Sequence, residues 1–215
     1  MTDLASFRIR VLDILGNATV TRFANDILDE GLRSALTEFS NALPNVITAA
    51  EVVATTGREQ TLSILDAKQI LNVAYPYDVT DQTLNLQYSW YAYRSNDTHV
   101  IQFSGDIIPQ AGETMLITYA APHSIDNLDS AVGTTVNDQY DTLLANGAAG
   151  FCAVMRASQV GESFRTQDYA RMQDWGLKSI AAFRATLARI RMDNTYAIPV
   201  PQSGWRMDRK DGERY

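Results

Sequence analysis

The sequence of this 215-residue chain predicts an α+β protein: a bundle of about four helices, an inserted antiparallel β-domain and an extended C-terminal tail. Three observations predict this class. Apolar residues recur at helical spacing near both ends of the chain. Between them, about 75 residues divide into short segments rich in β-branched and aromatic residues. Beyond the last helical pattern, two prolines favour extended backbone.

The helical spacing occurs in four segments, residues 3–15, 21–43, 138–158 and 163–192. Thr21 is the expected N-cap of the second segment, and Pro44 ends it. The fourth segment carries an apolar seam at alternating steps of three and four, formed by Tyr169, Met172, Gly176, Ile180, Phe183, Leu187 and Ile190. Such a seam predicts a long helix packed along its length.

The strand-like segments are separated by turn-forming residues. We expect six strands, at residues 46–55, 60–65, 69–77, 84–93, 99–105 and 114–121, in a sandwich or a barrel. The predicted domains are a helical bundle from 1–45 and 136–192, a β-domain at 46–121, a linker at 122–135 and a tail at 194–215.

The third helical segment contains "NGAAG", with two glycines in its interior. Each glycine costs a helix about 1 kcal/mol relative to alanine. Tertiary packing routinely outweighs that loss. We therefore expect another helix to approach closely at Gly147, Ala148 and Gly150, and at Gly176 of the fourth helix.

Charge is distributed unevenly along the chain, whose net charge is -7. Residues 1–150 hold 7 Lys and Arg against 18 Asp and Glu, which gives -11, and residues 151–215 hold 11 against 7, which gives +4. An acidic body with a basic end is typical of chains with a different partner at each end, although two solvated faces would look the same. No segment reads as a signal peptide or a membrane span, so we expect a cytosolic protein without membrane contact.

The residues that most often carry chemistry are few and scattered. His99 and His123 have no metal-ligand spacing, and Cys152, the single cysteine, reads as a small buried hydrophobe. The glycine pair follows no strand and precedes no Lys-Ser or Lys-Thr, so it is no phosphate loop. We expect no catalytic residue, metal or cofactor; a dispersed carboxylate pair of a hydrolase stays as a remote alternative.

Two aromatic regions suggest binding. In "YSWYAY" (88–93), Tyr88 and Trp90 share one strand face and Tyr91 and Tyr93 the other; the row either packs inside the β-domain or stacks on sugars or bases. The tail mixes aromatic, aliphatic and basic residues, which favours a segment that binds a protein partner. Its candidate binding residues are Tyr196, Ile198, Val200, Trp205, Arg206, Arg209, Lys210 and Arg214.

Three stretches, in this order of elements, resemble the head–tail connector adaptors of tailed bacteriophages. They are "SALTEFSNALPNV" (34–46), "IPQAGETMLITYAAPHSIDNLD" (108–129) and "NGAAGFCAVMRAS" (146–158), and with the helix order the resemblance covers roughly residues 20–192. The β-insert and the tryptophan-containing tail vary in such families.

The resemblance implies a non-catalytic structural protein of the virion neck, assembled in the host cytoplasm. Its implied partners are the portal protein, further copies of itself in a ring of about twelve, and a tail, stopper or nozzle protein. Double-stranded DNA would pass through the ring without sequence-specific binding, and an acidic lumen would let it slide. The resemblance assigns the tail residues to portal binding. A carbohydrate- or receptor-binding β-module is the alternative.

Overall fold

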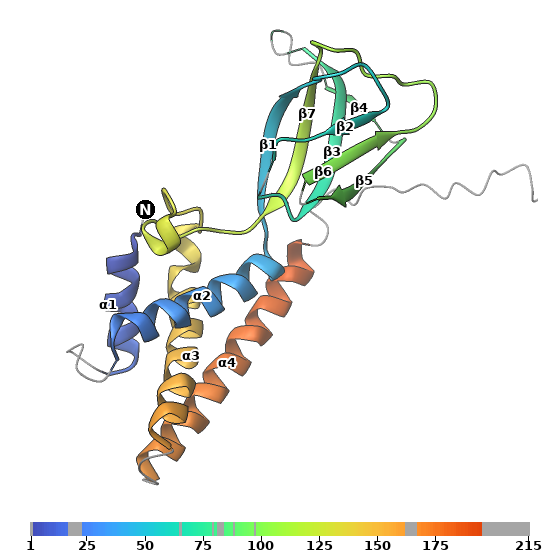
Figure 1. Cartoon of the computed structure of the whole chain (residues 1–215). Helices are drawn as coiled ribbons and strands as arrows, with labels where there is room; N and C mark the ends of the chain where they lie inside the picture. The colour runs from blue at the N-terminus through green and yellow to red at the C-terminus, as the bar shows by residue number, and fades with distance from the viewer. Residues whose placement is uncertain are drawn as a thin grey trace, which may run out of the picture. The chain divides into compact units, whose positions relative to one another are not determined.

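The computed structural model describes residues 2–16, 23–64, 66–78, 80, 84–87, 89–96, 98–161 and 167–194 (Figure 1). They form two compact units, one containing the chain up to residue 45 and again from 122, the other containing residues 46–121. The α+β class predicted from the sequence is confirmed. The C-terminal tail lies outside the described residues.

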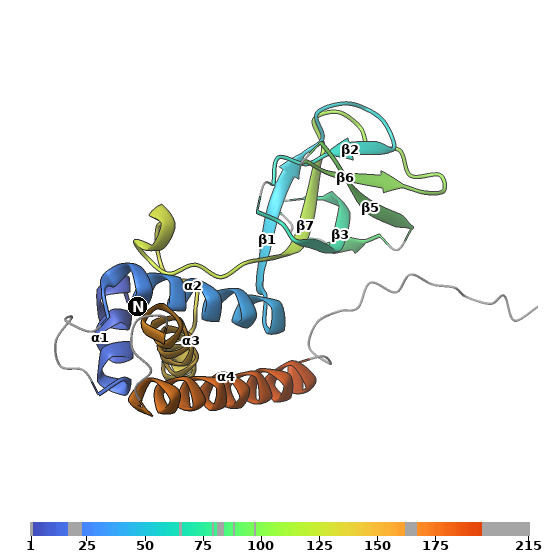
Figure 2. The same cartoon turned by 60° about the horizontal axis from the view of Figure 1, so that its bottom comes forward.

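The helical unit contains α1 (Leu4–Ile14), α2 (Asn25–Ala42), α3 (Asp141–Gly161) and α4 (Gln167–Asn194) (Figure 2). α3 packs against each of the other three helices. Asp3 caps α1 by accepting a hydrogen bond from the Ser6 amide at 2.9 Å. α2 begins after Ala24 without a side-chain cap, and the predicted cap, Thr21, lies outside the described residues. No helix in the described part of the chain is long and apolar enough to span a membrane.

The contacts within this unit fix the helix directions. The Cys152 thiol of α3 donates to the Ile27 carbonyl near the start of α2, and Tyr140, just before α3, stacks near Phe39 toward the end of α2. α2 therefore runs antiparallel to α3. α4 does the same, because Gly147 meets Phe183 while Gly150 meets Ile180. α2 and α4 are thus roughly parallel, and both end at the same end of the unit (Figure 2).

The segment at 122–135 differs from the linker expected there. Ile125 and Leu128 are buried in the core of the helical unit, and Leu128 begins a 3-10 turn, Leu128–Ser130 (η1). Polar contacts fix the segment: the Asp126 carboxylate accepts from the Gly133 amide at 2.9 Å, and the Asp126 amide donates to the Thr134 hydroxyl at 2.9 Å. Its few apolar residues follow no period, so the sequence pattern does not show that they are anchors.

The β-unit contains two sheets that share one core (Figure 1). One sheet has the order β1 (Asn45–Val52), β7 (Thr114–Ala121), β3 (Gln69–Tyr77), β4 (Leu84–Leu86). The other has the order β2 (Glu59–Thr61), β6 (Thr98–Phe103), β5 (Trp90–Ser95). Val73 and Ile117 of the first sheet and Ile101 and Phe103 of the second face the core. The barrel alternative is wrong, since the sheets do not close on one another.

The strand expected at 84–93 is two strands in different sheets. β4 pairs with β3, and β5 pairs with β6. The crossing occurs at Gln87–Ser89: the Gln87 amide still donates to the Val73 carbonyl, whereas the Ser89 carbonyl already accepts from Ser104. Alternation of side chains continues through the crossing, so the sequence pattern gave no sign of the change of partner.

Candidate functional site

The contact between α3 and α4 is built on glycine. A Cβ at Gly147 would lie 2.9 Å from three ring carbons of Phe183, and one at Gly176 would lie 2.9 Å from the Gly150 carbonyl oxygen. A Cβ at Gly150 would lie 3.0 Å from Ile180. These distances leave no room for a side chain, so the two backbones approach closely at this point.

A second close contact joins α3 to α2. Ala148 is fully buried, and a Cβ at Gly31 of α2 would lie 2.9 Å from the Ala148 carbonyl oxygen and would clash with the Cys152 sulfur. The sequence analysis did not single out Gly31. The sequence feature that could have identified Gly31 is the same as for Gly147 and Gly150: a glycine inside a helical pattern. Gly31 also lies among the buried residues of α2.

The side of α4 that faces away from this contact is partly apolar. Five exposed residues follow one another at steps of four, four, three and four: Leu177, Ala181, Ala185, Ala188 and Met192. Leu177 is 53% and Met192 72% exposed. From Lys178 to Met192 the helix has four cationic residues and no acidic one. An exposed apolar stripe with cations beside it is typical of a protein-binding face.

The loop before α3 combines left-handed backbone with an ion pair to α2. Asn127, Asp129 and Ser130 adopt left-handed backbone with φ of 66°, 53° and 63°, a conformation that non-glycine residues rarely take. The Arg33 guanidinium donates to both carboxylate oxygens of Asp129 and lowers the pKa of that carboxyl group. Val132 at the tip is 99% exposed.

In the β-unit the aromatic stretch divides between core and surface. Trp90 packs partly against the core and donates its indole N–H to the Gln87 carbonyl at 2.9 Å. Tyr91 and Tyr93 are 57% and 38% exposed, with ring centroids 6.2 Å apart. Tyr88 lies outside the described residues. The row is therefore not packed inside the domain as a whole.

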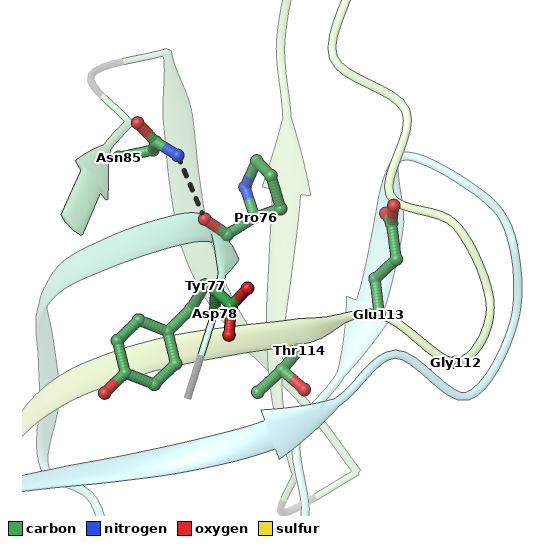
Figure 3. A pocket seen from close by; sticks show the side chains of 7 residues that line it. All are labelled: Pro76, Tyr77, Asp78, Asn85, Gly112, Glu113 and Thr114. Atoms are coloured by element: carbon green, nitrogen blue, oxygen red, sulfur yellow. Dashed lines mark hydrogen bonds between the residues drawn. The ribbon is translucent and has the colours of Figure 1, made fainter. Parts of the chain in front are cut away.

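An open hollow of about 470 Å³ lies at one end of the first sheet (Figure 3). It is lined by Pro76, Tyr77, Asp78, Asn85, Gly112, Glu113 and Thr114. Beside it, the Tyr75 hydroxyl donates to the Glu113 carboxylate and accepts from the Gln110 amide at 3.0 Å. Burial, and then Glu113, raise the pKa of Tyr75. The lining offers two carboxylates but no histidine, lysine or cysteine to act with them as a base or nucleophile.

His99, His123 and Cys152 each contact a neighbouring backbone or hydroxyl oxygen of the fold. A ring nitrogen of buried His99 lies 2.5 Å from the Ala67 carbonyl oxygen. His123 contacts the Thr135 hydroxyl at 3.1 Å, and its pKa is lowered by burial. Burial raises the pKa of Cys152 to about 12, so its thiol stays protonated. Among the described residues, no group of three or more His, Cys, Asp or Glu is placed to hold a metal ion.

The eight tail residues predicted to bind a partner, from Tyr196 to Arg214, lie outside the described residues. Of the predicted packing residues, Gly147, Gly150 and Gly176 lie at the α3–α4 contact, and Ala148 lies at the α2–α3 contact.

No known family model matches this chain, and no characterised protein matches its sequence. Solved structures match this chain with low sequence identity and a low TM-score. A chain in the neck of an empty gene transfer agent particle is 17% identical, with a TM-score of 0.32, over 76% of this chain and 79% of that chain. A chain in the virion of the native gene transfer agent particle is 18% identical, with the same TM-score and coverage.

Proposed function

We propose that this chain is a non-catalytic structural protein of a virion neck, a head–tail adaptor that forms a ring below the portal and docks tail components. The sequence resemblance to such adaptors supports this proposal, together with the element order of two helices, a β-unit and two further helices. The ring would have about twelve copies, as the resemblance implies, and would extend the DNA channel.

The observation that carries the proposal is the exposed apolar stripe of α4. A helix that serves only its own core carries apolar residues on one side. α4 has its buried seam and, in addition, exposed Leu177 and Met192 on a different side. Two of the cations beside this stripe already pair within the chain, Lys178 with Asp174 at 2.6 Å and Arg184 with Glu38 at 2.5 Å, so the proposed contact rests on the exposed apolar side chains.

We assign portal binding to the tail, residues 194–215, which lie outside the described residues. The segment is too short for a core of its own, yet it holds apolar and aromatic side chains that a partner would bury. Trp205 is the strongest candidate for a dominant contact, since tryptophan is enriched among such residues. Arg206, Arg209, Lys210 and Arg214 would pair with acidic groups of the portal, which fixes register more than it adds affinity.

We further propose that double-stranded DNA passes through the ring without binding to it. The first 150 residues carry a net charge of -11. If part of this charge lines the channel, it repels the phosphate backbone, and DNA slides instead of sticking.

The test is the mass of the complete protein, measured by native mass spectrometry alone and with a purified portal. We expect a portal-bound ring of about twelve copies. Ala185→Asp, on the apolar stripe of α4, should reduce ring formation at least about tenfold, because it places a carboxylate within an apolar contact. Ala182→Asp, an equally exposed alanine on another side of the helix, is the matched control. A folded protein that never associates with portals or with itself would contradict the proposal.

The exposed tyrosines favour one second candidate, a carbohydrate- or receptor-binding role for the β-unit. Tyr91 and Tyr93 present neighbouring rings, and the nearby Glu59 carboxylate raises the pKa of Tyr93. Aromatic rings beside a carboxylate suit a sugar ring. Glycan binding that is lost in Tyr91→Ala and in Tyr93→Ala, both of which keep the fold, would support this role over the adaptor role.

A further inference from the structure

The strand β5 is an open edge of the β-unit (Figure 2). In the order β2-β6-β5 it has β6 on one side, and within the described residues it pairs with no other strand. Four of its six residues are exposed. An open edge of this length is a template for another strand, and proteins usually cover or blunt such edges.

The other edge strands of the β-unit are less available than β5. β2 and β4 have three residues each. β1 is longer, but the segment after β2 contacts it, where the Ser63 hydroxyl donates to the Glu51 carboxylate at 2.8 Å. β5 also lacks the features that blunt an edge, since it has no proline, no bulge in its pairing with β6 and a single charged residue, Arg94.

The register shows which backbone groups β5 directs outward. The Ser104 amide donates to the Ser89 carbonyl at 2.7 Å, so these two residues bond to each other across the strands. In an antiparallel pair, hydrogen-bonded and non-bonded pairs of opposite residues alternate. The odd-numbered residues of β5 therefore bond to β6, and Trp90, Ala92 and Arg94 direct their N–H and C=O groups toward the open edge.

The side chains of these outward-bonding residues share the core face of the strand. Trp90 is opposite Phe103, and Ala92 is opposite Ile101; both partners on β6 are buried in the core. Trp90 is nevertheless only partly buried, and Ala92 and Arg94 are exposed. The core face is therefore incompletely covered along β5, and an added strand would extend it.

We propose that β5 pairs with β5 of a second copy of this chain, as antiparallel strands related by a two-fold axis at Ala92. In this register Ala92 lies opposite the partner's Ala92, and Trp90 lies opposite the partner's Arg94. All of these residues direct their backbone groups outward, so the two edges can exchange about six main-chain hydrogen bonds. The contact is isologous, since each copy offers the same strand.

The sequence of β5 is complementary to itself in this register. The two-fold axis creates two pairs of Trp90 with the partner's Arg94, and a guanidinium over an indole ring is a favourable cation–π contact. On the other face, Tyr91 lies opposite the partner's Tyr93, which is a stabilising aromatic pair. The small Ala92 side chain at the axis leaves room for the larger ones on either side.

Neighbouring registers lose these contacts. With the axis at Tyr93, the two copies of Arg94 would be diagonal neighbours, so like charges would approach each other. With the axis at Tyr91, Trp90 would lie opposite alanine, and the pairs of arginine with tryptophan would be lost. The charge and the aromatic residues of the strand thus favour one register with a copy of itself.

The first test is a disulfide at the two-fold axis of the complete protein. Hydrogen-bonded antiparallel pairs have Cα atoms about 5.5 Å apart, within the range for a disulfide. Ala92→Cys, oxidised in air with copper phenanthroline, should therefore give a covalently linked dimer. Buried Cys152 stays protonated and takes no part.

Tyr91→Cys is the matched control, because Tyr91 is also exposed but lies one residue away from the axis. Its two copies would be diagonal neighbours about 7–8 Å apart, beyond the range for a disulfide. We expect this variant to link at least about fivefold less than Ala92→Cys. Equal linking of the two variants, or no linking of Ala92→Cys, would overturn the proposal.

Sedimentation velocity gives a second measurement without added cysteines. Ala92→Pro removes the outward N–H groups at the axis and leaves the bonds of β5 to β6, and it should weaken the dimer at least about tenfold. Arg94→Gln should weaken it about fivefold. The dimer should persist in Ala185→Asp, which disrupts the proposed α4 contact, so this proposal and the proposed neck function fail separately.

Two results of the sedimentation experiment would contradict the pairing. One is an equal dimer dissociation constant for the unmodified protein and Ala92→Pro, with both folded by circular dichroism. The other is an unmodified protein that stays monomeric up to about 100 µM, which would leave the β5 edge to a strand of a different protein.

Discussion

The two units of this chain differ in how completely they fill their own contacts. Between α3 and α4 the backbones meet with no space for a single added carbon at Gly147 or Gly176. In the β-unit, by contrast, the core face of β5 is open at Ala92, and Trp90 is only partly covered. A contact without clearance holds one geometry, because packed interiors transmit strain instead of absorbing it. The difference predicts that substitutions at the α3–α4 contact cost more stability than substitutions on the exposed face of β5.

The largest effect is expected where α3 and α4 leave no room for a side chain. Gly147→Leu adds a four-carbon side chain at a position where a Cβ alone would lie 2.9 Å from the Phe183 ring. Overpacking of this kind typically costs about 1–3 kcal/mol, and we expect a loss in the upper part of that range. The free energy of unfolding is obtained from urea denaturation followed by circular dichroism at the helical band.

Asn146→Leu is the matched control, since the preceding residue of the same helix is exposed. It should change the free energy of unfolding by no more than about 0.5 kcal/mol. If Gly147→Leu were as stable as this control, α3 and α4 would not be in close contact at that point.

A smaller loss is expected for Gly176→Ala. Alanine improves helix propensity by about 1 kcal/mol, but the new Cβ would lie 2.9 Å from the Gly150 carbonyl oxygen, and backbone cannot move aside as a side chain can. We expect the cost of overpacking to exceed the gain in helix propensity, with a net loss of about 1 kcal/mol in the free energy of unfolding. Gly57→Ala in the β-unit, where nothing lies within 4 Å of the new Cβ, should be close to neutral. A higher melting temperature for Gly176→Ala would mean that the gain in helix propensity exceeds the cost of overpacking.

The fold class could be predicted from the sequence, but the partner of each element could not. The helix periods and the strand composition sufficed for the α+β class, because each element buries one face. Periodicity reports faces and not partners, so it missed that the stretch 84–93 changes sheets at Gln87–Ser89. It also missed Ile125 and Leu128 as core anchors, since their segment is held by irregular polar contacts that have no sequence period.

The candidate sites show the same limit. A glycine inside a helical pattern drew attention to α3, yet the sequence could not say that Gly147 meets Phe183 while Ala148 meets Gly31. The exposure of Tyr91 could not be read from a strand that is aromatic on both faces. It depends on which face of β5 is turned to the core, and the pairing with β6 puts Trp90, and not Tyr91, opposite the buried Phe103.

A third prediction concerns pH. Burial beside the Phe39 ring lowers the pKa of His123 in the folded state below its ordinary value of 6.5. The unfolded chain therefore binds a proton first as pH falls, and stability decreases from about pH 6.5 down to the folded-state pKa. His123→Gln should remove this part of the pH dependence, measured as the urea midpoint between pH 7.5 and 5. An unchanged slope in the variant would assign the acid sensitivity to other groups.

The smallest effect is expected at the β-unit surface, for Tyr91→Thr. Tyr91 is 57% exposed, and its backbone is bonded to β6 whatever its side chain. Threonine keeps a high strand propensity, so the substitution removes little except the exposed ring. We expect the free energy of unfolding to change by no more than about 0.5 kcal/mol, measured by urea denaturation with tryptophan fluorescence. A loss well above this would show that Tyr91 supports the fold, and the contrast between a filled helical contact and an exposed β5 would weaken. A neutral substitution that abolishes binding of a glycan or protein partner would instead show that the ring is kept for recognition.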